Sequence, residues 1–387
     1  MINENAYHAS ISMLQNASTS KGFVAAISSI ANYKRIWTRD GAICVIAALL
    51  SDNSELIETA KQTIITIFSN QHPNGFMPSN VKLESNEVSY GGTVGRVDNP
   101  SWAIIALCLY TNVTKDDSLK LRFSLNVEKS LALLDAWEFN GKHLVYMPQS
   151  GDWADEYIHH GYILFNQLLR VWCLKLAANV YKKNDYSNKA DVIIKVIEQN
   201  FWKQTKQKYY TENLSHLMPK KESEYWLMGF NPSRVYTYFD LQANALALYL
   251  KIGTKKQQKM VIEWIKNYVK SLKISLIPSF YPTIQFKDAD MKNLEHNYAY
   301  EFRNKPGQFH NGGIWNVWNG LLVLALNVHE EKKLATMITK SLHQTNSINN
   351  SFNECIDAKT LKPCGIDFCT WSAAGAIIAE KSFEKLI

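Results

Sequence analysis

The segment QSGDWADEY, residues 149–157, places three carboxylates within five positions: Asp152, Asp155 and Glu156. A solvated acidic turn would contain the same residue types. Acid–base chemistry needs more than acidic residues, because one carboxyl group must stay protonated as a general acid while a second stays ionised as a base. The elements around this segment therefore decide what it can do.

Asp152 is the residue in this segment best placed for a general acid. Gly151 before it allows close approach of a ligand, and Trp153 after it can shield the carboxyl group from water. Burial against an aromatic ring raises the pKa of a carboxyl group. Asp155 is the alternative, because one helical turn later it can orient Asp152 or bind a hydroxyl group. Glu156 is expected to face solvent.

The composition indicates a globular chain with a large core. Of its 387 residues 46% are hydrophobic, 12% aromatic and 20% charged, which excludes a disordered chain. Its 11 Trp and 19 Tyr suit a site that stacks on flat apolar faces such as sugar rings. The formal net charge is +7, but Lys and Arg occur in short mixed runs, so no nucleic-acid partner is expected.

No segment predicts a secretory leader or a membrane span. The N-terminal MINENAYHASISMLQNAS has no basic stretch followed by an apolar core, and no apolar, uncharged run is long enough to span a bilayer. We therefore expect a soluble cytoplasmic protein without a membrane partner. The sequence leaves homo-oligomer formation open.

No metal or cofactor is expected. Asp152, Asp155, His159 and His160 carry ligating atoms, but adjacent histidines point to different faces of a helix. The six cysteines fit no standard zinc spacing, so free thiols are predicted. They are Cys44, Cys108, Cys173, Cys355, Cys364 and Cys369.

Helix-period patterns recur along the whole chain and predict about twelve helices. The predicted ranges are 5–18, 40–50, 53–70, 100–112, 116–137, 160–183, 185–203, 236–252, 254–271, 312–328, 330–345 and 368–385. Short links (51–52, 113–115, 184, 253 and 329) alternate strictly with long ones (19–39, 71–99, 138–159, 204–235, 272–311 and 346–367). Because short links imply antiparallel neighbours, all six long loops should emerge at one end. Strand-like alternation is limited to pieces such as 144–146.

These elements predict an all-α fold. No linker or low-complexity run divides residues 1–387, so we expect one domain: an (α/α)6 toroid of six helical hairpins. Long loops in a compact domain are usually functional, so those at one end are expected to form a mouth. A solenoid of helix pairs has the same helix count, but these hairpins share no fixed period or signature.

Each long loop carries polar and aromatic residues, and most have a structural explanation when taken singly. Asp40 and Asp98 each stand before a helix start and can cap it. Arg39 and Arg96 can pair with neighbouring acids, and a lone His310 is usually structural. Convergence of six such loops at one mouth favours a sugar pocket, in which Arg and Asp bind hydroxyl groups and Trp stacks on a ring.

The motifs, taken together and in order, resemble a known group of glycosidases. They are IWTRDG, GRVDNPSW, SGDW followed by HGYILFNQLL, FDLQANALAL, FHNGGIWNVW, FNECIDAKT and FCTWSAAGAIIAEK. This series is similar to the neutral/alkaline invertases of glycoside hydrolase family 100. It is also similar to bacterial amylo-alpha-1,6-glucosidase-like and glycogen-debranching-like proteins. The resemblance runs from about Tyr33 to Glu380, and its most specific parts are the order of the motifs and the HNGGxW segment.

The resemblance implies an (α/α)6 barrel that hydrolyses a glycosidic bond with inversion, with an Asp acid and a Glu base. Asp152 matches the family's acid and Glu354 its base, and such a pair should stand about 6.5–9.5 Å apart. The matches to sugar-binding positions are Arg39, Asp40, Arg96, Asp98, His310, Asn311, Gly313 and Trp315. The mouth loops add Trp37, Trp153 and Asp155 as expected substrate contacts.

The chain departs from the family pattern at four places. Asn316 and Asn353 stand where the family has Pro, Cys355 where it has Tyr, and Ala358 where it has Gly. These changes leave the groups that carry chemistry in place and alter their packing. They bear on the identity of the substrate more than on the type of reaction.

Three interpretations of the site remain open. The first is a hydrolase of small oligosaccharides, acting on sucrose, an α-1,6-linked glucosyl stub or another small α-glucoside. The second is a sugar epimerase or isomerase on the same barrel, which normally needs paired His bases, whereas only His310 lies in a strong mouth motif. The third is a non-catalytic carbohydrate-binding protein, which would need neither Asp152 nor Glu354.

Overall fold

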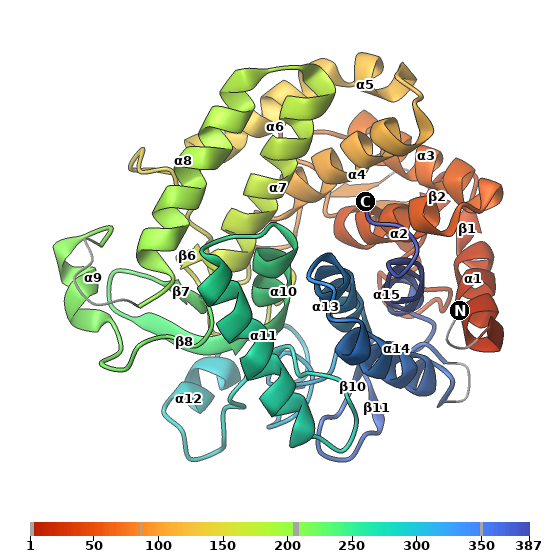
Figure 1. The fold of residues 1–387 in the computed structure, drawn as a ribbon. Coiled ribbons are helices and arrows are strands. Elements are labelled where there is room, and N and C mark those ends of the chain that lie inside the picture. The colour runs from red at the N-terminus through yellow and green to blue at the C-terminus, as the bar shows by residue number, and fades with distance from the viewer. Residues whose placement is uncertain (1–3, 86, 204–208, 349–350) are drawn as a thin grey trace.

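The chain is mostly α-helical. The computed structural model describes residues 4–85, 87–203, 209–348 and 351–387 (Figure 1). Within these ranges, six helices have residues buried on nearly every side, as expected for helices that are apolar all round. We call them the inner helices: α2 (Thr38–Ser51), α4 (Asn99–Thr114), α7 (Leu164–Tyr181), α10 (Leu241–Tyr249), α13 (Asn316–Val328) and α15 (Thr370–Lys381).

The inner helices follow one another around a ring. Along the chain each one packs against the next, and α15 packs against α2. In Figure 1 they lie around the middle of the molecule, with the other long helices outside them. The arrangement is consistent with an (α/α)6 barrel.

The outer helices are amphipathic and bury one face each. They are α1 (Glu4–Asn16), α3 (Ser54–Ser69), α5 (Ser118–Arg122), α6 (Ser124–Ala136), α8 (Asn184–Asn200), α11 (Lys255–Lys270) and α14 (Lys332–Asn346). Helices α3, α8 and α14 each pack on the inner helix that precedes them in the chain. Helix α1 packs on α15, so the two ends of the chain form one pair.

Tight reversals join three inner helices to their outer partners. Asp52, Lys115 and Lys182 follow α2, α4 and α7 with φ values of 55°, 61° and 55°. A residue in this left-handed conformation ends a helix and turns the chain back within a few residues. The short links predicted at these places are confirmed.

Several predicted helix boundaries are wrong. The predicted helix 116–137 is divided at Phe123 into α5 and α6. The predicted helices 160–183, 236–252 and 312–328 begin at Leu164, Leu241 and Asn316. Two short helices, α9 (Glu212–Leu217) and α12 (Asp290–Glu295), lie inside predicted loops. Local apolar periodicity continued past the true ends of the helices, so it misplaced them.

The described chain contains more short strands than the sequence pattern indicated. The largest sheet in the described chain has the antiparallel order β6–β7–β8–β9, with β6 (Tyr162–Ile163), β7 (Leu227–Phe230), β8 (Val235–Asp240) and β9 (Phe280–Tyr281). The others are β3–β4–β5 (Arg35–Trp37, Asn80–Lys82, Val88–Ser89), β1–β2 (Ser18–Thr19, Gly22–Phe23) and β10–β11 (Cys355–Ile356, Pro363–Cys364). The predicted strand piece 144–146 is not one of them. Strands this short leave little alternation to detect.

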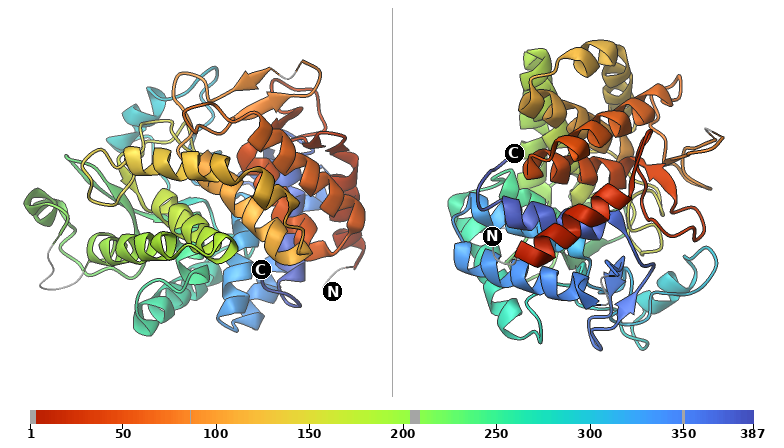
Figure 2. Two further views of the ribbon diagram at one scale, coloured as in Figure 1. Left: turned by 90° about the horizontal axis from the view of Figure 1, so that it is seen from above. Right: turned by 90° about the vertical axis from the view of Figure 1, so that its right-hand side faces the viewer.

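All these strands lie in links that lead from an outer helix to the next inner helix. In the right-hand view of Figure 2, the orange segment with β4 and β5 and the cyan segment around α12 lie on the same side of the molecule. These segments are where the sequence predicted the mouth loops.

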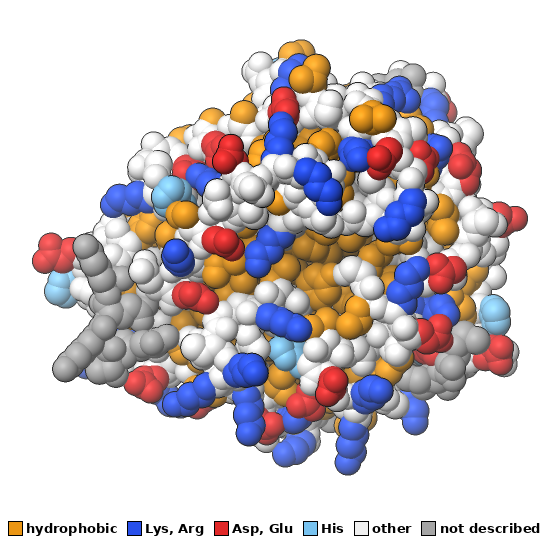
Figure 3. All heavy atoms as spheres, turned by 45° about the horizontal axis from the view of Figure 1, so that its top comes forward, with side chains coloured by type: hydrophobic (Ala, Val, Ile, Leu, Met, Phe, Trp, Pro, Cys, Tyr) orange, Lys and Arg blue, Asp and Glu red, His pale blue; other side chains and the backbone are white. Residues whose placement is uncertain are grey.

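The surface and the helices show two further properties. On the face in Figure 3, Lys and Arg side chains are interspersed with Asp and Glu, with apolar groups between them. None of the described helices combines the length and apolarity that a bilayer crossing requires. The six cysteines are free thiols, as predicted.

Candidate active site

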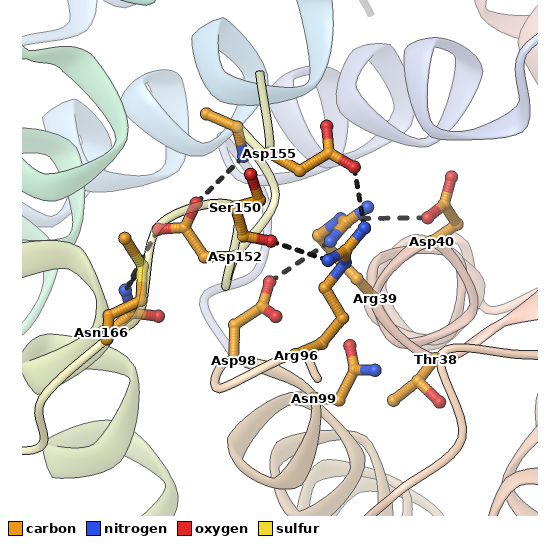
Figure 4. Close-up of polar contacts among 12 residues, drawn as sticks. Thr38, Arg39, Asp40, Arg96, Asp98, Asn99, Ser150, Asp152, Asp155 and Asn166 are labelled. Carbon is orange, nitrogen blue, oxygen red and sulfur yellow. Dashed lines mark hydrogen bonds and ion pairs between the residues drawn. The ribbon is translucent and has the colours of Figure 1, made fainter. Parts of the chain in front are cut away.

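Two arginines and three carboxylates lie together in the cluster drawn in Figure 4. Arg39 and Asp40 belong to the first turn of α2, Asp98 stands immediately before α4, and Arg96 and Asp155 come from long loops. Arg96 Nη2 contacts Asp155 Oδ2 at 2.7 Å, and Arg39 Nη1 contacts Asp98 Oδ2 at 3.3 Å. Asp40 Oδ2 lies 3.9 Å from Arg39 Nε. The structure thus brings together five residues that the sequence predicted in the mouth.

Asp155 is the most open carboxylate of this arginine–carboxylate cluster. Its side chain is 39% exposed, whereas those of Asp98 and Asp40 are 0% and 7% exposed. Burial raises the pKa of Asp98 to about 6 and also raises that of Asp40, although Arg39 opposes both changes. Burial also raises the pKa of Asp155, although the charges of Arg96, Arg39 and Arg303 oppose the rise. A partly exposed carboxyl group with a raised pKa is a candidate general acid.

Asp152 points away from the cluster, toward Asn166 on α7 (Figure 4). It is 1% exposed, and its carboxylate accepts hydrogen bonds from the backbone N–H of Ala154 at 3.0 Å and from Asn166 Nδ2 at 3.0 Å. Its Oδ2 also lies 3.1 Å from His159 Nε2. Burial raises the pKa of Asp152, but His159 and these hydrogen bonds outweigh it, so the pKa lies below its ordinary value. The direction of this shift is opposite to the one expected for Asp152 from burial alone.

Trp153 packs among other aromatic rings. Its indole packs edge-on against Trp315, Trp318 and His310, with ring centres 4.9–5.2 Å apart. Trp153 is 3% exposed, and it belongs to the aromatic core beneath the loops.

Glu354 lies in a second part of the site, immediately before β10. It is 4% exposed; Tyr33 Oη donates to its Oε1 at 2.9 Å and the Ile366 N–H to its Oε2 at 3.3 Å. Burial raises the pKa of Glu354 to about 7, although Tyr33, Arg303 and Ile366 favour the ionised form. Gly365, with φ +77°, approaches this carboxylate so closely that a β-carbon would overlap it. The local fold thus holds a carboxyl group that changes charge near neutral pH.

Comparison with known proteins points in one direction. The family model described as alkaline and neutral invertase matches residues 207–385. No curated protein sequence matches. The GH63 mannosylglycerate hydrolase from Thermus thermophilus is 14% identical, with a TM-score of 0.69 over 96% of this chain and 99% of that chain.

Two other solved structures share the fold. A bacterial glucoamylase complexed with acarbose is 15% identical, with a TM-score of 0.65 over 98% of this chain and 55% of that chain. An alpha-amylase from Clostridium perfringens is 14% identical, with a TM-score of 0.61 over 98% of each chain. Together these matches support a glycosidase. Structural similarity at such low identity shows the fold alone, so the chemistry must be argued from the site.

Arg303 acts electrostatically on both parts of the site and was not predicted from the sequence. Its Nη2 contacts Glu156 Oε1 at 2.9 Å, and its guanidinium lies over the ring of Phe309, 3.9 Å from the ring centre. Its positive charge favours the ionised forms of Asp155 and Glu354, and so opposes the rise in pKa that burial causes at both carboxyl groups. Glu156 is 6% exposed, so the expectation that it faces solvent is wrong. No local motif marks Arg303, because it lies in an irregular loop.

Tyr33 and Trp371 were also missed as site residues. Tyr33 reaches Glu354 from 321 positions earlier in the chain. Trp371, in the first turn of α15, lies 5.6 Å from the guanidinium of Arg39, measured to the ring centre. Trp371 stands within the motif FCTWSAAGAIIAEK, and Tyr33 lies shortly before the motif IWTRDG, at the start of the region of resemblance; this was the available signal.

Four predicted residues of the fifth loop have mainly structural contacts. Asn311 uses its side chain to bind the backbone of Ile284 and Asn304. Gly313 packs against the backbone of Phe309, which leaves no room for a β-carbon, and Trp315 Nε1 donates to Phe309 O at 3.0 Å. His310 stacks on Trp315.

The His310 ring lies 5.4 Å from that of Trp315, centre to centre, and is 1% exposed. Burial and the charges of Arg303, His159 and Arg39 hold its pKa well below the ordinary value, so the imidazole is neutral. Its Nδ1 has no hydrogen-bond partner within the described chain.

Trp37 lies at the edge of the predicted mouth. It ends β3, is half-buried, and donates from Nε1 to the backbone oxygen of Asn32 at 3.0 Å. Its ring lies 6.5 Å from that of Tyr33, which binds Glu354. Trp37 is therefore near the base part of the site.

Several buried polar atoms around the cluster lack a partner among the described residues. They are Asp98 Oδ1, His310 Nδ1, Trp318 Nε1 and Trp371 Nε1. Buried polar atoms are nearly always hydrogen-bonded, so unpaired ones call for an explanation. A polyhydroxylated ligand or water would supply partners for both donors and acceptors.

Proposed function

We propose that this chain is an inverting glycoside hydrolase of small oligosaccharides, with Asp155 as general acid and Glu354 as general base. The observation that carries the proposal is the contrast between the two carboxyl groups. Asp155 is partly open, beside Arg96, whereas Glu354 is buried under Tyr33 with a pKa of about 7. Acid–base pairs typically consist of two carboxyl groups whose different surroundings give them different pKa values.

Asp152, the acid expected from the resemblance, becomes a positioning residue in this proposal. Its carboxylate accepts from the Ala154 N–H and so fixes the turn that leads to Asp155. An ionised, fully bonded carboxylate cannot donate a proton, but it can hold a turn rigid. The loop is held from outside as well, because Asn297 Nδ2 donates to the backbone oxygens of Asp155 and Tyr157 at 3.3 and 2.7 Å.

The proposed reaction moves two protons. As the bond from the anomeric carbon to the glycosidic oxygen breaks, its electron pair goes to that oxygen, which takes the proton of Asp155. A water molecule attacks the anomeric carbon from the opposite face and gives its proton to Glu354. This geometry requires the carboxyl groups to stand about 6.5–9.5 Å apart, with room for the water. The configuration at the anomeric carbon is therefore inverted.

Substrate binding is proposed for the rest of the cluster. Arg39, Asp40 and Asp98 can hydrogen-bond to adjacent sugar hydroxyls, and the unpaired Asp98 Oδ1 is free to accept. In this account residues 1–387 form one six-hairpin toroid, and the links that bear the strands form its mouth. No cofactor is needed for the reaction as written.

A small sugar is the proposed substrate class. Sucrose is favoured because the matching family model is described as alkaline and neutral invertase. An α-1,6-linked glucoside is the alternative from the motif resemblance. Mannosylglycerate belongs among the candidates because a structural neighbour is a mannosylglycerate hydrolase.

The test is the release of free monosaccharide from sucrose, isomaltose, maltose, trehalose, mannosylglycerate and a branched limit dextrin. Wild type is compared with Asp155→Asn and with Asp152→Asn as the matched control. Loss of a general acid typically costs 10²–10⁴-fold. We expect Asp155→Asn to lose turnover to that extent and still bind the sugar, and Asp152→Asn to be less stable but active while folded.

A second comparison identifies the acid directly. A substrate with a good leaving group does not need protonation of the glycosidic oxygen, so it should restore turnover to Asp155→Asn and not to Glu354→Gln. If Asp152→Asn is the variant restored in this way, Asp152 is the acid and the assignment proposed here is wrong. Absence of turnover on every substrate would contradict the hydrolase proposal.

A further inference from the structure

Two cysteines face each other beside the proposed base. Cys355 in β10 and Cys364 in β11 are direct partners in an antiparallel pair. Side chains of directly opposed residues leave the same face of the ribbon and contact each other. Both cysteines are free thiols; Cys355 is buried and Cys364 is partly exposed. The proposed hydrolysis uses neither of them.

The same two strands position Glu354, the proposed base. Glu354 directly precedes Cys355, and Gly365 directly follows Cys364. The Glu354 N–H donates to the backbone oxygen of Ile366 at 2.7 Å, and the Ile366 N–H donates back to the Glu354 carboxylate at 3.3 Å. Gly365 is packed against that carboxylate without room for a β-carbon. The position of the base therefore depends on the spacing of these two strands.

We propose that Cys355 and Cys364 form a reversible disulfide by exchange with a small-molecule disulfide, and that this bond displaces Glu354 and slows hydrolysis. Opposed residues of an antiparallel pair have Cα atoms about 4.5–5.5 Å apart, within the range of about 4.4–6.8 Å found in disulfides. Their Cβ atoms are about 4.5–5.5 Å apart in a relaxed ribbon, whereas a disulfide holds them at about 3.8 Å. Closing the disulfide therefore draws the two strands together and moves Glu354, the proposed base.

The exchange proceeds in two steps. The Cys364 thiolate attacks one sulfur of the small disulfide, which forms a mixed disulfide and releases one small thiolate. The Cys355 thiolate then attacks Cys364 Sγ, which closes the protein disulfide and releases the second small thiolate. Two protein thiols are oxidised, one small disulfide is reduced to two thiols, and the protein thiol protons pass to solvent.

The surroundings of the two thiols determine which thiol reacts first and how easily the disulfide is reduced again. Burial raises the pKa of the Cys355 thiol, so the accessible Cys364 reacts first. A disulfide that pulls its strands from their relaxed spacing is strained, and strained disulfides are easily reduced. The bond should therefore open again when a thiol reductant is added.

The bond is tested by mass spectrometry on the full chain treated with oxidised glutathione. We expect a species lighter by two hydrogen atoms, with the peptide that contains Cys355 linked to the peptide that contains Cys364. Cys369 lies near this segment, so Cys369→Ser is the matched control and should still form the link. Cys364→Ser should not form it. Absence of the link in wild type, or its survival in Cys364→Ser, would overturn the proposal.

The effect on hydrolysis rests on the proposed function and is measured separately. A shift of about 1 Å in a catalytic group can cost about 10²-fold, so the oxidised enzyme should lose activity by about that factor and recover it with dithiothreitol. Cys364→Ser should keep its own activity after the same treatment. Unchanged activity in a chain shown to carry the disulfide would refute the displacement of Glu354. A reduced chain that cleaves none of the sugars refutes the hydrolase proposal, and the mass measurement still decides on the disulfide.

Discussion

Replacing Glu354 by Gln should abolish hydrolysis and at the same time stabilise the protein at alkaline pH. The folded chain raises the pKa of this carboxyl group from 4.5 to about 7, chiefly by burial. At 1.36 kcal/mol per pH unit, this difference corresponds to about 3 kcal/mol by which the ionised group destabilises the fold above pH 7. Gln has the same shape and carries no charge.

The sign of the effect gives its pH dependence. Above pH 7 the folded carboxylate is ionised and the full destabilisation is present. As the pH falls from 7 to 4.5 the folded group takes up a proton before the unfolded one, so the destabilisation declines, and below 4.5 it is absent. The advantage of Glu354→Gln should therefore approach about 3 kcal/mol at pH 8 and vanish near pH 4. That value is an upper limit, because one carboxylate oxygen becomes an NH2 group in Gln. Tyr33 Oη, which donates to Glu354, must then turn to accept a hydrogen bond from this group, and the change costs free energy.

Urea unfolding followed by tryptophan fluorescence measures this difference, with wild type and variant compared at the same pH. Asp152→Asn is a control of opposite sign, because the pKa of Asp152 is lowered by its partners. Asp152→Asn should destabilise the fold at pH 8. The free energy of unfolding that it loses relative to wild type should become smaller as the pH falls below the ordinary pKa range of a carboxyl group. A Glu354→Gln variant no more stable than wild type at pH 8, or with the same advantage at pH 8 and pH 4, would refute the reasoning.

Three further substitutions act on the surroundings of the base. Tyr33→Phe removes a hydrogen bond that favours the ionised Glu354, so the acid limb of the kcat/KM profile should move up by about 1 pH unit; an unmoved limb would contradict the assignment of the base. Gly365→Ala should cost about 1–2 kcal/mol of stability and lower kcat by about 10²-fold, because the new methyl group displaces the carboxylate. Gly141→Ala is its control, with φ +65° and open space around it, so it should lose stability but keep kcat. Arg303→Gln removes a positive charge that favours the carboxylate, and its acid limb should also move to higher pH; a changed KM with an unmoved limb would show that Arg303 serves only in binding.

The helical part of the fold could be predicted because each inner and outer helix carries its own signal. Burial of every side of α2, or of one face of α11, is encoded by residues adjacent in sequence. The strands could not be predicted, since β6 pairs with β7 from a distant part of the chain and each contributes only a few residues. The β6–β7 pairing depends on a distant partner and not on a local period.

The choice of acid shows the same limit within the site. Asp152 and Asp155 lie three positions apart and have similar neighbours in sequence. Their roles differ because His159 and Asn166 fold back on Asp152, whereas Arg96 reaches Asp155 from another loop. The contacts with His159 and Asn166 reverse the direction of the pKa shift that burial alone would cause at Asp152.

The anomeric form of the first sugar released tests the central claim most directly. Proton NMR can follow the panel of small glycosides with wild type and with Glu354→Gln, before the product equilibrates. The account predicts that an α-linked substrate gives the β-anomer first, because water attacks from the face opposite the leaving group, and that Glu354→Gln gives none. Release of the α-anomer first, or of sugar at an undiminished rate by Glu354→Gln, would contradict the assignment of Asp155 and Glu354 as an inverting pair.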